Sequence, residues 1–453
     1  MSSSHDTNPN PGMRRLCWLV AALQLACASA RSGPTPPDAP ALPRMSRQIA
    51  LREDWLARRH ALLLEMMRRH GVGMWIVMNQ EFHDDPLTQY IAPPLPYAGF
   101  VDVFAFIDAG EQGLKKYALT GGDAHLARFF EPFDEKVFVM KALSELVASY
   151  QPRTIALNMG GTRGVTRSLT RDSYAWLVKA LGPEGEARFI PAEPLITEYL
   201  DTRLPEERET YRTLVALTEH MVRRALSPEV VKPGVTRVGE VVDWLYDELG
   251  RAGVGTWFQP FMHVQRAGQV GRMEGRFLAP AEAEVVIQRG DVLHVDFGLS
   301  AMGLSTDWQR MAYVLREGER DVPEGLKRAL ANMNALQDAL VAVSRPGLSS
   351  AEVYEAVMAR MQERGIQAQV YSHPLGNQGH GLGATIDFRG AHGRDTPQPL
   401  RAGSYLAVEL NARSPVPEWN NQEVYVFGED PAELTDAGWR FFLPRQDSWY
   451  VID

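Results

Sequence analysis

Apolar positions in the first part of the chain switch between helical and strand-like spacing. Residues 49–70 carry apolar side chains at helical spacing, and Gly71 follows where the helix would end, so this stretch predicts an amphipathic helix. A second helical pattern covers 168–181. Between them, short apolar runs with β-branched residues predict strands at 74–78, 101–107, 117–120 and 154–157. This mixture predicts an α/β unit that ends near Leu200.

A second folded unit is predicted after residue 204. Pro205-Glu206-Glu207 suits the first turn of a helix that continues to Leu226. Ser349 and Glu352 have the spacing of a capping box at the start of a later helix. Helices are predicted at 238–249, 324–343 and 351–364, and strands at 285–287, 292–297, 311–315, 405–410 and 423–427.

The first thirty residues have the pattern of a secretory signal. Arg14-Arg15 precedes an apolar run that extends from Leu16 to Cys27, and Ala28-Ser29-Ala30 supplies the small residues that signal peptidase accepts. The run is shorter than the ~20 residues that a membrane-spanning helix needs. We therefore predict a signal peptide over 1–30 and an exported protein, either periplasmic or secreted.

Two alternatives for this segment remain open. Cys27 follows Leu25-Ala26 in a pattern that resembles a lipoprotein attachment site, and lipidation there would anchor the protein to a membrane. The other alternative is an unstructured segment or a core helix at the N-terminus. The next residues, 31–46, are rich in proline and predict a stiff, extended linker.

Composition narrows the classes of function. The formal net charge of -9 leaves no general excess of Lys and Arg for a nucleic-acid surface. Both cysteines, Cys17 and Cys27, lie in the predicted leader, which excludes disulfides and cysteine catalysis from the folded part of the chain. Hydrophobic residues make up 45% and charged residues 23%, the usage of an ordinary globular protein with a sizeable core.

Acidic residues interrupt three apolar strands of the second unit. Asp296, Glu409 and Glu423 each stand in such a strand. A charge buried there would cost several kcal/mol unless it is paired or bound to metal. Asp307 lies eleven residues after Asp296, and a turn at Gly303 could return it beside Asp296 in a hairpin. These positions predict that carboxylates gather at one site.

A histidine completes the candidate ligand set. His380 stands between Gly379 and Gly381, and flanking glycines let the backbone approach a site while the imidazole stays available. Each residue alone has an ordinary alternative, such as a strand edge, a turn or a loop. Together they form a set of mostly oxygen ligands with one nitrogen: Asp296, Asp307, His380, Glu409 and Glu423.

This order of residues resembles the pita-bread metallopeptidases, which include aminopeptidase P, prolidase and methionine aminopeptidase. The resemblance implies an α/β N-terminal domain followed by an α+β pita-bread catalytic domain. It divides the chain into a creatinase-like N-terminal domain at 47–204 and a catalytic domain at 205–453. A homodimer is a further expectation at the level of the family.

For the site, the resemblance implies two divalent metal ions. Asp296 would chelate one ion, His380 would belong to the other, and Asp307 and Glu423 would bridge them. Glu409 would be both a ligand and the catalytic acid and base. The oxygen-rich set favours Mn²⁺, with Co²⁺ or Zn²⁺ as alternatives. 

Two more side chains are expected to lie near this site. Arg310, three residues after Asp307, matches a family arginine and would support the Asp307 carboxylate. His294 shares a predicted strand face with Asp296, so it is expected to pack beside that carboxylate or to support it.

Two histidines of the family pattern are absent at the expected places. The family's peptidases carry one 17 residues before the first aspartate, where this chain has Phe277-Leu278-Ala279. They carry another seven residues after the ligand histidine, where Asp387 stands. These histidines shuttle protons and contact the peptide, so their absence puts Xaa-Pro specificity in doubt. Three histidines are candidates to replace them: His263, His373 and His392.

The predicted function is an exported, binuclear metal-dependent aminopeptidase or dipeptidase for short peptides, with Xaa-Pro bonds as candidates. One alternative is a metal-dependent hydrolase of a non-peptide amide or ester, which the changed histidines allow. The other is a catalytically silent, peptide-binding pita-bread module. The ligand types argue against the module and against the metal-free creatinase branch, because neither needs carboxylates in apolar strands.

The leader pattern makes a direct prediction about processing. The mature protein should begin near Arg31, or at Cys27 if it is lipidated. Cell fractionation followed by N-terminal sequencing measures this. An intact N-terminus on a cytoplasmic protein would contradict the predicted signal peptide.

Overall fold

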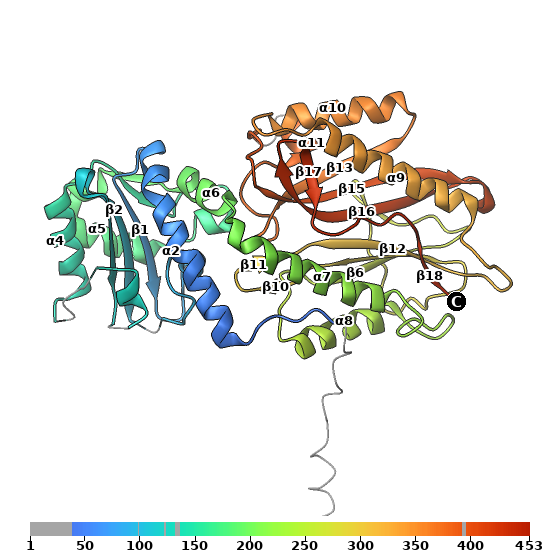
Figure 1. Cartoon of the computed structure of the whole chain (residues 1–453), viewed down its shortest axis with the longest axis horizontal. Helices are drawn as coiled ribbons and strands as arrows, with labels where there is room; N and C mark the ends of the chain where they lie inside the picture. Colours follow the sequence, from blue (N-terminus) through green and yellow to red (C-terminus); the bar gives the residue numbers. More distant parts are fainter. Residues whose placement is uncertain (1–38, 98, 122–123, 132–135, 392–395) are drawn as a thin grey trace, which may run out of the picture. The chain divides into compact units, whose positions relative to one another are not determined.

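The computed structural model describes residues 39–453, except residues 98, 122–123, 132–135 and 392–395. The predicted signal peptide, Cys27 and residues 31–38 of the predicted linker lie outside these residues, as does His392. Within the described part of the chain, no helix is both long enough and apolar enough to cross a membrane. Residues from Pro40 onward form one compact unit that carries two large sheets (Figure 1).

The first sheet has five strands in the order β3-β2-β1-β4-β5. The strands are β1 (Met74–Gln80), β2 (Val101–Asp108), β3 (Leu114–Leu119), β4 (Ile155–Leu157) and β5 (Phe189–Pro191). Neighbours among β1, β2 and β3 are antiparallel, whereas β1, β4 and β5 run parallel. The accompanying helices are α2 (Met45–Arg69), α3 (Thr88–Ile91), α4 (Val139–Tyr150), α5 (Arg171–Glu186) and α6 (Glu193–Asp201).

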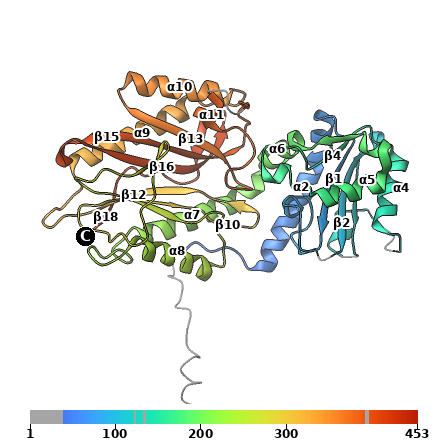
Figure 2. The same ribbon diagram turned by 180° about the vertical axis from the view of Figure 1, so that it is seen from behind.

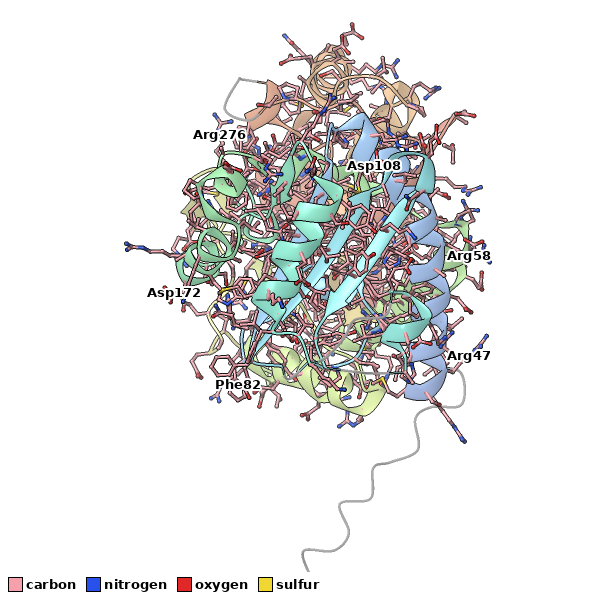
Figure 3. All side chains as sticks on the ribbon, turned by 90° about the vertical axis from the view of Figure 1, so that its left-hand side faces the viewer. Arg47, Arg58, Phe82, Asp108, Asp172 and Arg276 are labelled. Atoms are coloured by element: carbon pink, nitrogen blue, oxygen red, sulfur yellow. The ribbon has the colours of Figure 1, made fainter. Side chains whose placement is uncertain are left out.

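Strand β1 feeds two hydrophobic cores, because successive side chains of a strand point to opposite faces of a sheet. Trp75 and Val77 pack with residues of α2 and α6. Met74, Ile76 and Met78 pack with residues of α4 and α5 on the other face. Figure 3 looks onto this unit and shows α2, which carries Arg47 and Arg58, along one side of the strands. The result is the predicted α/β unit.

The second large sheet has the order β14-β13-β15-β16-β12-β9-β6, with β17 beside β16 and β18 beside β12. Its strands are β6 (Phe261–Gln265), β9 (Val292–Phe297), β12 (Trp308–Val314), β13 (Gln367–Leu375), β14 (Ile386–Asp387), β15 (Tyr405–Val416), β16 (Gln422–Thr435), β17 (Gly438–Phe441) and β18 (Tyr450–Ile452). Two short hairpins accompany it, β7 (Met273–Glu274) with β8 (Phe277–Leu278), and β10 (Ser300–Ala301) with β11 (Leu304–Ser305).

Helices cover this sheet through two separate cores. One core packs α9 (Glu324–Val343) and α10 (Ser350–Glu363) against β15 and β16. The other packs α7 (Arg208–Ala225) and α8 (Val238–Ala252) against β9 and β12. A short helix, α11 (Phe388–Ala391), follows β14. Figure 2 shows the same elements from behind.

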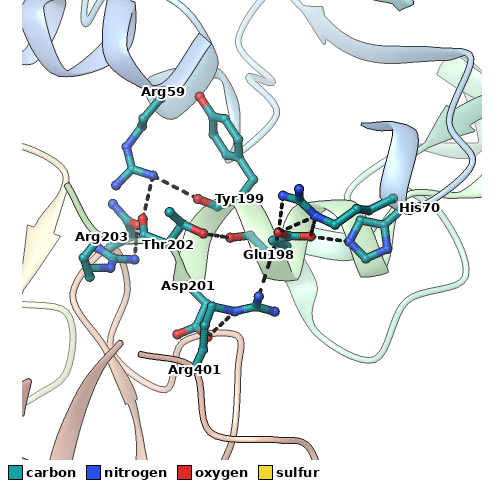
Figure 4. Close-up of polar contacts among 10 residues, drawn as sticks. Arg59, His70, Glu198, Tyr199, Asp201, Thr202, Arg203 and Arg401 are labelled. Carbon is teal, nitrogen blue, oxygen red and sulfur yellow. Dashed lines mark hydrogen bonds and ion pairs between the residues drawn. The ribbon is translucent and has the colours of Figure 1, made fainter. Parts of the chain in front are cut away.

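Charged side chains around α6 connect it with α2 and with the segment that leads into β15 (Figure 4). The buried Arg59 of α2 donates to the carbonyl oxygens of Tyr199 (2.9 Å) and Thr202 (3.0 Å). Arg401, four residues before β15, lies 3.3 Å from Asp201 and forms an ion pair with it. Buried charges need such partners, so these contacts fix the course of the chain between the two sheets.

Most predicted elements are present in the structure. Helix α9 has the predicted bounds, and Ser349 caps α10 by accepting a hydrogen bond from Ala351 N (3.3 Å). The strand predicted at 285–287 is wrong. Its backbone bonds instead to the loop before α8, for example from Gly234 N to Ile287 O (2.7 Å), and forms only an isolated bridge. The predicted boundary after residue 204 lies between α6 and the short 3₁₀ turn Pro205–Glu207.

Candidate metal centre

Four polar side chains form one row across the second sheet. Strands β9, β12, β16 and β15 are consecutive neighbours, and their register sets Asp296 opposite Gln309, Gln309 opposite Glu429, and Glu429 opposite Glu409. Directly opposed residues of antiparallel strands project from the same face. The register therefore gathers three carboxylates and one amide on a single face.

The hairpin between β9 and β12 adds a fourth carboxylate. The chain turns at Met302 and Gly303, both in the left-handed region (φ 55° and 71°), and returns beside β9. Asp307 ends this return immediately before β12 and is two residues from Gln309, so it faces the same side. The predicted hairpin that places Asp307 beside Asp296 is confirmed.

An imidazole from β13 lies among these carboxylates. His373 pairs with Ala407 of β15, and its Nε2 atom lies 3.4 Å from Asp307 Oδ2, 3.5 Å from Glu409 Oε2 and 3.6 Å from Glu429 Oε1. These distances are longer than those of well-formed hydrogen bonds. The imidazole is thus surrounded by carboxylates without being bonded to any one of them.

The cluster contains two potential ligand groups that share one residue. One group is Asp307, His373 and Glu429, and the other is Asp296, Glu409 and Glu429. In each group the ligand atoms lie within 4.8 Å of one another. Several of these buried atoms have no hydrogen-bond partner: Asp296 Oδ1, Asp307 Oδ1, His373 Nε2 and both carboxylate oxygens of Glu429. Unsatisfied anionic oxygens at this depth fit a divalent cation, which prefers carboxylate and imidazole ligands.

Burial and mutual repulsion shift the protonation of the cluster. Burial, followed by the charges of Asp307 and Glu409, raises the pKa of Asp296 and that of Glu429 well above the usual range. Burial also raises the pKa of Glu409. Although burial opposes a charge on His373, the surrounding carboxylates raise its pKa well above the ordinary value. Without a cation, the cluster therefore holds protons.

The prediction of Glu423 as a ligand is wrong, and Glu429 occupies the position. Glu423 lies opposite Pro415, its side chain is 43% exposed, and it accepts a hydrogen bond from Gln367 Nε2 (2.8 Å). Six residues of extended strand, roughly 20 Å, separate it from Glu429. Both residues project from the same face of β16 by alternation, so only the pairing with β15 and β12 distinguishes them.

The histidine prediction also needs correction, because His373 and not His380 lies among the carboxylates. His380 has a left-handed backbone (φ 49°) and places its ring edge-on to Trp257 (centroids 5.1 Å apart) and to His373 (4.5 Å). Its side chain stays partly open to the adjacent cavity. Partial burial, followed by the charge on His373, lowers the pKa of His380 to about 4.

This correction changes what is missing from the family pattern. His380 is seven residues after His373, at the spacing where the resemblance expects a second histidine. Asp387 therefore does not stand in its place. It is buried and forms an ion pair with Arg389 (2.5 Å). The strand-like sequence around His373 could have identified this residue as the ligand. The prediction relied instead on the histidine between Gly379 and Gly381.

Arg310 does not support Asp307, contrary to the prediction. Its side chain points to the opposite face of β12 and donates to Asp430 Oδ1 at 2.7 Å, with both side chains buried. Asp430 also accepts a hydrogen bond from Gln337 Nε2 of α9 (2.7 Å). Strand alternation explains the result, because a residue one position from Gln309 faces away from the cluster.

Two buried histidines lie beside the cluster. His263 of β6 and His294 of β9 stack on each other with ring centroids 4.9 Å apart, and their Nδ1 atoms are 2.8 Å apart. His294 Nε2 also contacts Gln309 Oε1 at 3.0 Å. His294 is therefore packed beside the site and also connected to it through Gln309, so both of its predicted alternatives are met. His263 is a buried residue of strand β6.

A cavity of about 630 Å³ opens next to the cluster. Asp296, Asp307, His373, His380 and Glu409 line it. Aromatic side chains form much of the remaining wall: Trp257, Phe261, Phe277, Tyr371, Phe388 and Phe427. Such a wall suits the apolar parts of a bound molecule, while the polar groups converge on one region.

The raised pKa values predict how the stability of the metal-free protein depends on pH. The folded state binds more protons than the unfolded state above the ordinary carboxyl pKa of about 4, and for His373 above about 6.5. Stability should therefore fall as pH rises through this range, by about 1.4 kcal/mol per pH unit for each excess proton. Thermal unfolding with a chelator at pH 5 to 8 measures it, and Glu429→Gln should give a shallower fall. A flat or rising profile for the chelated protein would contradict the assignment.

Comparisons with solved structures agree with this architecture. The X-Pro aminopeptidase of Thermotoga maritima superposes with a TM-score of 0.63 at 16% identity, over 85% of this chain and 99% of that one. The Xaa-Pro dipeptidase of Bacillus anthracis gives 0.60 at 15% identity, over 87% and 99%. Aminopeptidase P of Escherichia coli with the inhibitor Pro-Leu gives 0.58 at 16% identity, over 86% and 94%. At these identities the likeness establishes the fold.

A match in sequence establishes the family. Comparison with curated protein sequences gave no match. The sequence pattern of metallopeptidase family M24, however, matches residues 209–436, which is half of the chain. This stretch contains every residue of the carboxylate cluster, and the fold is the predicted α/β unit followed by an α+β pita-bread domain. The chain is thus an enzyme that belongs to metallopeptidase family M24.

Proposed function

We propose that the chain is a binuclear metal-dependent aminopeptidase or dipeptidase that hydrolyses short peptides, with Xaa-Pro peptides as the first candidates. The observation that carries the proposal is the pair of ligand groups that share Glu429. A site for one ion would need only one such group. Two groups with a common carboxylate support two neighbouring ions.

Five side chains would hold the ions. Asp296 and Glu409 would bind one ion, His373 and Asp307 would bind the other, and Glu429 would reach both. The buried oxygens without partners support this assignment, because a cation would satisfy them. The oxygen-rich set favours Mn²⁺, with Co²⁺ or Zn²⁺ as alternatives. Two such ions, when bound, polarise the scissile carbonyl and make water a better nucleophile at neutral pH.

Glu409 is the residue of the cluster best suited to carry a proton. Its Oε1 atom accepts a hydrogen bond from Gln309, whereas its Oε2 atom lies 3.5 Å from His373 Nε2. Burial raises its pKa, which brings a carboxyl group closer to the pH at which it can both accept and release a proton. Glu409 would take the proton from the attacking water and pass it to the leaving amine nitrogen.

His380 is suited to contact the substrate. Its lowered pKa keeps the imidazole neutral at pH 7, so one ring nitrogen can donate a hydrogen bond and the other can accept one. Its ring is held by Trp257 and His373 and lines the cavity. The aromatic wall would exclude water from the scissile bond and pack against the substrate's apolar side chains.

Export is a separate part of the proposal and depends on the leader pattern of residues 1–30. With that leader, the enzyme would act on peptides outside the cytoplasm, in the periplasm or the medium. The two alternative functions differ from this proposal in what the protein would do to a bound molecule. A non-peptide amide or ester hydrolase would use the same cluster with another ligand in the cavity, whereas a silent peptide-binding module would not hydrolyse any substrate.

The test of the proposed function uses a matched pair of variants in one strand. The purified chain with Mn²⁺ should bind two ions, hydrolyse members of a panel of dipeptides and tripeptides, and lose activity to a chelator. Glu429→Gln should lose at least one ion and nearly all activity, because an amide is a much weaker ligand for a divalent cation. Glu423→Gln should keep both its metal content and its activity, since Glu423 is exposed and distant from the cluster. Metal analysis and peptide assays measure these outcomes.

The results separate the three functions. Hydrolysis of amide or ester panels without peptide turnover would favour the non-peptide hydrolase. Metal-free protein that binds peptides without cleaving them would favour the silent module. Loss of metal from Glu423→Gln, with normal content in Glu429→Gln, would overturn the ligand assignment.

A second variant tests the proton-carrying role of Glu409. Glu409→Gln keeps the shape of the side chain and one oxygen ligand, but it cannot carry a proton. The variant should fold and keep at least one ion while kcat falls by about 10²- to 10⁴-fold, with a smaller change in KM. Steady-state kinetics with metal analysis measures this. Near-normal kcat with both ions bound would show that another group carries the proton.

A further inference from the structure

Gln309 is the one uncharged member of the row that crosses the four strands. It lies between Asp296 of β9 and Glu429 of β16, and only 2% of its surface is exposed. Its amide nitrogen donates to Asp296 Oδ2 (3.0 Å) and to Glu409 Oε1 (2.7 Å). One side-chain amide therefore bonds two carboxylates that are proposed to hold the same ion.

The orientation of this amide depends on whether the carboxylates beside it are ionised. Gln309 Oε1 lies 3.0 Å from His294 Nε2, which can donate to it. The reversed orientation would set the amide oxygen against two carboxylates, which cannot donate when ionised. When a cation keeps both carboxylates ionised, the amide nitrogen faces Asp296 and Glu409, and His294 then donates to the amide oxygen from Nε2.

His294 is itself held in a stack of rings. Its ring lies 4.9 Å from that of His263 and 4.4 Å from that of Phe427. His263 in turn lies parallel to Phe427 within 8°, and its Nε2 atom lies 2.9 Å from the carbonyl oxygen of Leu278. The donor that fixes the amide thus has little freedom to move.

The two hydrogen bonds divide the carboxylate oxygens into two sets. Gln309 occupies one oxygen of Asp296 and one of Glu409, while Asp296 Oδ1 has no partner and Glu409 Oε2 lies toward His373. A Lys or Arg at this position would donate equally well but would neutralise the cluster and compete with a cation. An amide orders two carboxylates without adding positive charge.

We propose that Gln309 is a positioning residue that turns the free oxygens of Asp296 and Glu409 toward the metal site, and that His294 acts through it. The inference rests on the proposed metal-dependent function. Its consequence is that loss of the amide weakens metal binding and disturbs the coordination, even though Gln309 is not itself a ligand. A merely structural glutamine would affect stability alone.

The test compares Gln309→Met with a matched control, Gln337→Met. Gln337 is also a fully buried glutamine that donates to a buried carboxylate, Asp430, but outside the cluster. Gln309→Met should bind Mn²⁺ roughly ten- to a hundredfold more weakly in calorimetric titration and change the visible spectrum of the Co²⁺-loaded protein. Gln337→Met should lower the Tm and leave affinity and spectrum unchanged.

A second variant tests the connection through His294. His294→Phe keeps a ring in the stack but removes the donor to Gln309, so its Mn²⁺ affinity should also fall. The double variant should lose no more affinity than Gln309→Met alone, because both changes act through the same amide. This variant also decides the matter if Gln309→Met does not fold.

Three results would count against the inference. Wild-type affinity and spectrum in Gln309→Met, or in His294→Phe if the first variant is unfolded, would overturn it and leave the proposed function intact. Additive losses in the double variant would overturn the role of His294. Failure of the wild-type protein to bind Mn²⁺ at all would overturn the proposed function, and this inference with it.

Discussion

Carboxylates that are buried close together repel one another, and the catalytic sheet has to hold four of them on one face. At 4 Å, two like charges oppose each other by about 4 kcal/mol with an effective dielectric constant of about 20. Cross-strand pairing holds Asp296, Glu409 and Glu429 in place, and the hairpin adds Asp307. Two hydrophobic cores lock the strands that carry them, so the apolar packing opposes the repulsion. Such a cluster is stable only with protons or cations among its oxygens.

Strand alternation keeps the arginine of β12 away from this face. Arg310 follows Gln309 directly, yet alternation turns it to the far side, where Asp430 neutralises it. The donor that remains on the cluster face is the uncharged amide of Gln309. The imidazole of His373 also lies on this face, and it can lose its proton when a cation binds. Strand β12 thus has an ion pair on one face and, on the other, the amide that bonds the proposed metal ligands.

The α/β unit also reaches the site, through the glycine-rich segment that carries His380. Tyr90 donates to the carbonyl oxygen of Asn377 (2.6 Å), and Arg203 bonds the side chain of the same residue. Gly379 packs so tightly on Trp257 that a Cβ atom there would lie 2.1 Å from the indole ring. The position of His380 in the cavity therefore depends on contacts from both halves of the chain.

The sequence alone determined many of the helices and strands, the order of the two units and three of the five cluster residues: Asp296, Asp307 and Glu409. Helical and strand periodicity are local properties, and an eleven-residue hairpin spacing is nearly so. The tertiary structure decided the rest. Glu423 and Glu429 share a strand face, so alternation cannot separate them, and only pairing with β12 and β15 sets Glu429 in the row. Of the two histidines, only His373 lies on a strand paired with β15, and this pairing sets it among the carboxylates. The register between distant strands depends on packing, which no short stretch of sequence contains.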